Sequence, residues 1–138
     1  MRKKYFVLAE AVLLLFVLAI VCAGCSARTS EKVRDLEFTV VSEELLPEKV
    51  AELILEKKNE AFDFTYTDHE NLYLCVGYGR QNTGGYSIVV DDLYLTGENV
   101  YVNTTLLGPK SGERKTQTPS YPVLVIKTEY IEKPVIFH

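Results

Sequence analysis

The apolar residues of this 138-residue chain change their spacing near residue 61, and that change restricts the folds open to it. Before this point Val50, Leu53 and Ile54 recur at helical spacing, whereas from Ala61 onward apolar and polar residues alternate in short runs. A period of 3.6 residues is typical of an amphipathic helix, and a period of two is typical of a half-buried strand. Repeated short strands with one helix indicate an α+β domain. The sequence therefore predicts a single small α+β domain with a mainly antiparallel sheet and one amphipathic helix.

The helix is expected from about Pro47 to Asn59. Proline suits the first helical turn, and glutamates close to it match the positive end of the helix dipole. A strand is expected before the helix, where Leu36, Phe38 and Val40 alternate with polar residues.

Further strands are expected after the helix, in the runs 62–66, 72–78, 86–90, 93–95, 100–106, 123–126 and 135–137. Asp91 and Asp92 separate two of these runs and predict a turn between two strands. The segment Thr96–Asn99 predicts a short hairpin connection. Two loops remain, a glycine-rich one at 77–85 and a polar one from Gly108 to Pro119.

The first 25 residues resemble a bacterial lipoprotein signal. Three basic residues at positions 2–4 precede fourteen uncharged residues from Ala11 to Gly24, and small residues stand before Cys25. The sequence predicts a signal peptide at residues 1–24, lipidation of Cys25, a polar tether at 25–32 and the folded domain at 33–138. The expected location is extracytoplasmic, with the protein lipid-anchored to the bacterial cell membrane.

Two alternatives to lipidation stay open at this stage. Residue Cys22 occupies the position where a lipobox usually carries Leu or Val. The twenty residues from Tyr5 to Gly24 are long enough for an uncleaved membrane anchor, although Glu10 would then enter the edge of the hydrocarbon. An ordinary cleaved secretory signal is the other alternative.

The charge of the chain argues against nucleic acid as a partner. Residues 1–24 contain three of the 15 basic residues and one of the 19 acidic residues, so the remaining chain has a net charge of −6. Binding to nucleic acid depends mainly on neutralising phosphates with Lys and Arg, and the sequence has no basic stripe that would do so.

The residues that could carry catalysis or bind a metal do not form a recognisable pattern. His69 lies between two acidic residues in an expected turn, and His138 is the last residue. Cys75 lies in an apolar run and is expected in the core. Asp91 and Asp92 lack the ligand spacing of an EF-hand, and a strand rather than a helix follows the glycine-rich loop. We therefore expect no enzymatic activity, no metal and no cofactor.

Two segments resemble the PrcB C-terminal domain family. The first is Gly79-Arg80-Gln81-Asn82-Thr83-Gly84-Gly85-Tyr86-Ser87-Ile88, in which Thr-Gly-Gly-Tyr opens a strand. The second comprises Thr116-Gln117 and Tyr121-Pro122, followed by the apolar run 123–126. The resemblance covers about residues 72–137. It implies a non-catalytic accessory subunit that stabilises or positions a subtilisin-like surface protease.

The loops that carry this resemblance are the expected contact surface for another extracytoplasmic protein. Tyrosine is enriched at protein interfaces because it buries area and keeps a wet hydroxyl. The predicted partner-binding residues are Arg80, Thr83, Gly84, Gly85, Tyr86 and Tyr121. The membrane would be reached through the N-terminal lipid. A protease inhibitor that presents one of these loops, or an envelope or adhesion module, are the alternatives.

Overall fold

Strands account for most of the regular structure in this protein. The computed structural model describes residues 30–113 and 116–138, so the predicted signal peptide and Cys25 lie outside the described residues. The elements are β1 (Lys32–Asp35), β2 (Thr39–Val40), the 3-10 helix η1 (Glu43–Leu45), α2 (Glu48–Lys57), β3 (Ala61–Thr67), β4 (Asn71–Tyr78), β5 (Ser87–Thr96), β6 (Val100–Leu107), β7 (Val123–Glu129) and β8 (Val135–Phe137).

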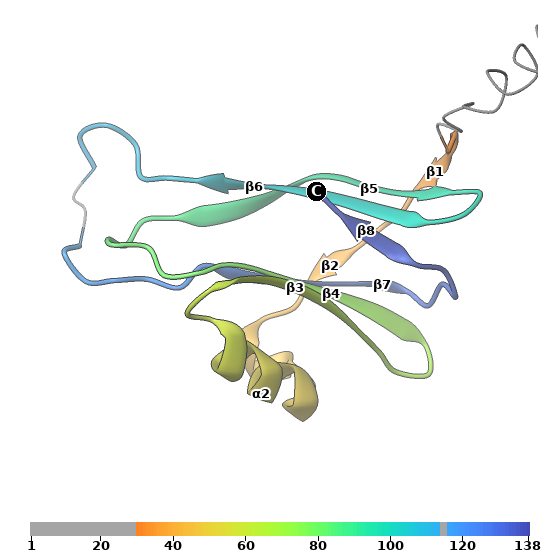
Figure 1. Cartoon of the computed structure of the whole chain (residues 1–138), viewed down its shortest axis with the longest axis horizontal. Coiled ribbons are helices and arrows are strands. Elements are labelled where there is room, and N and C mark those ends of the chain that lie inside the picture. Colours follow the sequence, from red (N-terminus) through yellow and green to blue (C-terminus); the bar gives the residue numbers. More distant parts are fainter. Residues whose placement is uncertain (1–29, 114–115) are drawn as a thin grey trace, which may run out of the picture.

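The strands form two four-stranded sheets that lie as two layers (Figure 1). The upper sheet has the order β1-β5-β6-β8, and the lower sheet has the order β2-β7-β4-β3. Every strand pair is antiparallel except β6–β8, which is parallel. Helix α2 lies beneath the lower sheet (Figure 1). The prediction of a small, mainly antiparallel domain with one α-helix is confirmed, but the strands are divided between two sheets.

The chain changes sheets just before the helix, where the sequence predicts one strand over residues 36–40. That prediction is wrong, because β1 pairs with β5 in the upper sheet and β2 pairs with β7 in the lower sheet. Between them Leu36 is only 4% exposed, and its backbone N–H donates to the Leu93 carbonyl at 3.0 Å. Strands that switch sheets in this way form the corners of β-sandwiches.

The predicted turn at Asp91–Asp92 is also wrong, because β5 continues through it. The pairing of β5 with β6 shifts between Val90 and Asp92, so Asp91 is an extra residue in a β-bulge. The Asp91 carboxylate accepts a hydrogen bond from the Thr105 hydroxyl at 2.6 Å. A bulge interrupts the alternation of side chains, and in the sequence this interruption resembles the end of a strand.

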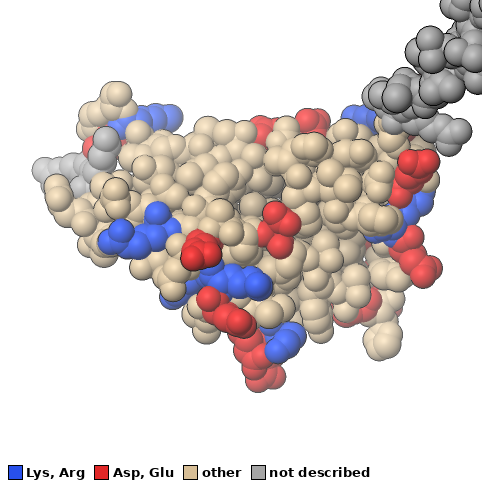
Figure 2. Space-filling model, in the orientation of Figure 1, with Lys and Arg blue, Asp and Glu red and all other residues tan. Residues whose placement is uncertain are grey.

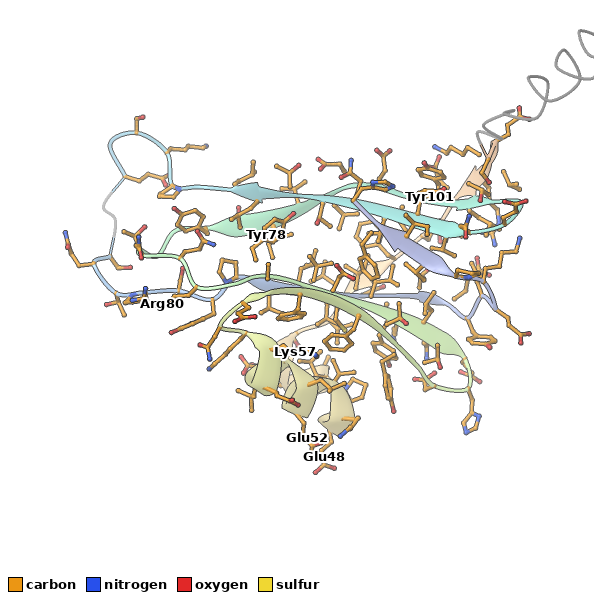
Figure 3. All side chains as sticks on the ribbon, in the orientation of Figure 1. Glu48, Glu52, Lys57, Tyr78, Arg80 and Tyr101 are labelled. Carbon is orange, nitrogen blue, oxygen red and sulfur yellow. The ribbon has the colours of Figure 1, made fainter. Side chains whose placement is uncertain are left out.

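The predicted helix at 47–59 is confirmed as α2, with Pro47 at its N-cap. Val50 is fully buried against the lower sheet, while Glu48 and Glu52 lie on the side of the helix away from the sheet (Figure 3). No helix of the described residues has the length and apolar character needed to cross a membrane.

Two apolar clusters stabilise the layers. The cluster between the sheets is built from Leu36, Leu72, Leu74, Leu93, Val100, Val102 and Ile126. The cluster between the lower sheet and α2 is built from Val50, Tyr73, Cys75 and Val125. The Tyr78 hydroxyl also joins the layers, because it reaches from the lower sheet and donates to the Thr104 carbonyl of β6 at 2.7 Å (Figure 3).

Gly77 gives a first test of the packing. A Cβ at this position would run into the ring of Phe62, which lies opposite on β3. We expect Gly77→Ala to lower the free energy of unfolding by about 1–3 kcal/mol, as overpacked cores do. Urea denaturation measures the change. Gly97→Ala is the matched control, because a Cβ there meets nothing within 4 Å, and it should change stability by less than about 0.5 kcal/mol. Equal stability of the two variants would contradict the packing described.

Cys75 gives a second test. Its side chain is fully buried in the cluster between the lower sheet and α2, and burial raises the pKa of the thiol to about 12. Because the thiolate is the reactive form, iodoacetamide at pH 8 should leave Cys75 unmodified in the folded protein and alkylate it after unfolding. Peptide-level mass spectrometry distinguishes Cys75 from Cys22 and Cys25. Rapid alkylation in the folded protein would show that the cluster is open.

Candidate protein-binding surface

The two loops that the sequence singles out lie side by side. The loop after β4 and the loop before β7 are joined by an antiparallel bridge between Gln81 and Ser120. The Gln81 N–H donates to the Ser120 carbonyl at 2.8 Å, and the Ser120 N–H donates back at 3.1 Å. Residues almost forty positions apart therefore form one surface.

Side chains add to this connection. The Ser120 hydroxyl donates to the Thr83 carbonyl at 2.7 Å. The Gly84 N–H donates to the Thr116 carbonyl at 3.3 Å and to its hydroxyl at 3.1 Å. A Cβ on Gly84 would overlap that hydroxyl, so a larger residue would require the Thr116 side chain to move and would break the hydrogen bond to it. Thr83 and Gly84 therefore have a structural part in holding the loops together.

Gly85 also has a conformational role. Its φ is +87°, and a Cβ would lie 3.0 Å from Pro109 of the second loop. Residues with a Cβ rarely adopt this backbone conformation. Gly85 can therefore turn the chain into β5 at a position where another residue would be strained. Tyr86 follows and is half-buried. Its ring lies next to Gly108, where a Cβ would be 3.5 Å away.

Arg80, Gly85 and Tyr121 are the exposed residues among those predicted to bind a partner, and Arg80 and Tyr121 are the two of them that carry a side chain. The Arg80 guanidinium donates to the Asn82 side chain at 3.3 Å, and the Arg80 backbone N–H donates to the Asn59 carbonyl after α2. The Tyr121 ring is 37% exposed, and the Lys58 ammonium lies 5.3 Å from its centroid. These side chains present a cation and an aromatic ring to solvent, the groups enriched in interface anchors.

A groove continues this surface along α2, and the sequence did not predict it. The hollow measures about 400 Å³ and runs between the helix and β7. Its apolar lining comprises Val41, Leu46, Ala51, Ile54, Leu55, Tyr121, Val123 and Val125. Leu55 forms one side of it and is 63% exposed. The one feature of the sequence that could have indicated this groove is that Leu55 is apolar but falls outside the apolar stripe of Val50 and Ile54.

The loops lie at the far end of the sandwich from the start of β1. In Figure 1 the chain enters β1 at the right, where the β5–β6 hairpin also lies, and both loops project at the left. Arg80 is labelled at this left end in Figure 3. Basic and acidic side chains are interspersed over the face shown in Figure 2.

The titratable turn at Asp68–Glu70 has a structural explanation. The Asp68 carboxylate accepts hydrogen bonds from the backbone N–H groups of Glu70 at 2.9 Å and Asn71 at 2.8 Å, and from the Tyr73 hydroxyl at 3.1 Å. The bond from Glu70 is the main cause that lowers the pKa of Asp68. His69 is exposed at the tip of the turn. Asp68 thus closes the β3–β4 hairpin.

The other reactive side chains are dispersed. His138 stacks on Tyr101 with ring centroids 5.7 Å apart, on the outer face of the upper sheet. Cys75 is enclosed between the lower sheet and α2, far from the outer face of the upper sheet. Within residues 30–113 and 116–138, no group of three or more His, Cys, Asp or Glu side chains converges as a metal site would require.

Comparison with known proteins finds a family match over part of the chain. No curated protein and no solved structure matches the chain. A family described as PrcB C-terminal matches residues 72–129, a range that contains both loops and the four strands from β4 to β7. The resemblance carried by Thr83-Gly84-Gly85-Tyr86 is thereby confirmed, because residues 72–129 of this chain match the PrcB C-terminal family.

Proposed function

We propose that this protein is a lipid-anchored, extracytoplasmic, non-catalytic subunit that binds another extracytoplasmic protein and stabilises a surface protease complex. The observation that carries the proposal is that the matched range, 72–129, contains both loops that the structure joins. The match of residues 72–129 to the PrcB C-terminal family suggests a subunit associated with a protease complex. The further steps, from association to anchoring and stabilisation, are our inference from the sequence and the surface.

The joined loops are suited to binding because they are held in place before a partner arrives. Fixing a loop costs conformational entropy, and a surface that is already ordered avoids this cost on binding. The bridge between Gln81 and Ser120 and the bond from Ser120 to Thr83 supply that order. Tyr121 and Leu55 then offer exposed apolar area beside the basic groups of Arg80 and Lys58.

Anchoring at the opposite end would strengthen such an interaction. A protein tethered through Cys25 stays near other proteins of the same membrane, which raises the effective concentration of each for the other. The binding loops would face away from the tether, since β1 begins at the other end of the sandwich (Figure 1).

Lipidation is tested with a single substitution. Cells that express the chain should incorporate radiolabelled palmitate into it, and Cys25→Ser should abolish the label because the serine hydroxyl does not replace the modified thiol. Cys22→Ser is the control and should keep the label. Equal labelling of Cys25→Ser and the parent would contradict lipidation at Cys25, and absence of label from the parent would favour an uncleaved anchor or an ordinary cleaved signal.

Partner binding is tested by site-specific photocrosslinking in the bacterium that expresses the protein. A photoreactive amino acid at Tyr121 should yield a discrete crosslinked species with a second protein, and Arg80→Glu should reduce its yield at least tenfold. The same probe at Glu98, an exposed residue in the β5–β6 hairpin at the other end, is the matched control. Crosslinks of equal yield from both positions, or from neither, would contradict the proposed surface.

The effect on the partner separates a stabilising subunit from an inhibitor. If the crosslinked partner is a protease, adding the purified chain should lengthen the half-life of its activity at constant initial rate. A concentration-dependent fall of the initial rate would instead identify an inhibitor.

A further inference from the structure

Strand β3 is an unusually open edge of the lower sheet. The two sheets end in β1, β8, β2 and β3. Strand β2 has two residues, β8 has three, and β1 is charged and irregular in its pairing. Strand β3 has seven residues, pairs with β4 without a shift, and contains neither Pro nor Lys. Long regular edges of this kind are usually protected or paired.

The hydrogen-bond register shows which backbone groups of β3 are available. The Asp68 N–H donates to the Asn71 carbonyl at 3.1 Å, which makes Asp68 and Asn71 a hydrogen-bonded pair of the β3–β4 hairpin. Hydrogen-bonded pairs recur at every second residue of an antiparallel strand. Phe62, Phe64 and Tyr66 therefore direct their backbone N–H and C=O groups to β4. The backbone groups of the alternate residues, Ala61, Asp63, Thr65 and Thr67, point out of the sheet edge. No strand of the described chain lies beside them.

The side chains of β3 follow the same alternation. The three aromatic residues pack on the side of α2, and the rings of Phe62 and Phe64 stack with centroids 5.7 Å apart. The side chains of Asp63 and Thr65 lie on the other side and are exposed. One face of the edge is therefore aromatic, and the opposite face is small and polar.

We propose that two copies of this chain pair through antiparallel β3 strands, with Asp63 of each copy beside Thr65 of the other. The strand is self-complementary in this register. All four outward-facing residues find a partner, and Phe64 of one copy lies opposite Phe64 of the other, flanked on both sides by Phe62–Tyr66 pairs. Aromatic pairs of this kind are among the favourable cross-strand contacts. The two lower sheets become one continuous sheet.

Asp63 fixes the register of this pairing. A charge on the inner face of an edge strand commonly prevents association, and two Asp63 side chains directly opposite one another would repel. A shift of two residues places each carboxylate beside a threonine hydroxyl and moves the two carboxylates from opposite to diagonal positions, which weakens that repulsion. The pairing uses a different surface from the loops at 80–86 and 109–121, and it does not depend on the proposed protease complex.

Sedimentation velocity of the full chain in a mild detergent tests the proposal. The parent should show a concentration-dependent equilibrium between one and two copies. Thr65→Pro should raise the dissociation constant at least tenfold, because it removes an outward N–H that β4 does not use. Thr65→Asp should raise it at least tenfold by facing Asp63 of the other copy, and Thr65→Lys should lower it at least threefold through the opposite charge.

Matched charge changes at a distant residue and a check of folding serve as controls for these variants. Thr118→Asp and Thr118→Lys carry the same charge changes on an exposed loop residue and should leave the dissociation constant unchanged. Circular dichroism verifies that each variant is folded. The proposal is overturned if the parent is monomeric throughout the range up to several hundred micromolar, or if Thr65→Asp and Thr65→Lys shift the constant in the same direction.

Discussion

The burial of β4 on both faces is the constraint on which the rest of the structure depends. Leu72 and Leu74 point into the cluster between the sheets, and Tyr73 and Cys75 point into the cluster between the lower sheet and α2. A strand buried on both faces must be apolar at consecutive positions, which is what the run Leu72–Val76 provides. Because β4 pairs with β3 on one side and β7 on the other, it also positions the edge and the loops.

The local pattern predicted the elements better than their partners. Alternation identified β3 and β6 to within two residues, and the apolar stripe identified α2. The strand expected at 36–40 was wrong because no local signal shows that Leu36 lies at a crossing between two sheets. The turn expected at Asp91 was wrong because a bulge disturbs alternation as a turn does. Both errors depend on strand pairing, which is a contact between residues distant in sequence.

The same distinction applies to the surface. The family resemblance identified Arg80 and Tyr121, and the structure shows both exposed. Thr83 and Gly84 were expected to bind a partner, but their observed contacts connect the two loops. Leu55 was missed because it belongs to the helix, and the groove beside it exists only where the helix packs on β7. A sequence motif can identify a loop, whereas a groove between elements requires their arrangement.

Three separate regions of the domain would carry the three proposed interactions. The proposed tether would precede β1, the loops lie at the opposite end of the sandwich, and β3 forms a lateral edge of the lower sheet (Figure 1). A twofold axis perpendicular to the lower sheet at Phe64 reverses the strand direction, so the loops of each copy would lie at the end where the tether of the other copy begins. Two tethers per dimer would then hold the pair at the membrane more firmly than one, since detachment requires both to release. Pairing through β3 would therefore place the long axis of the pair along the membrane, with one tether and one set of loops at each end.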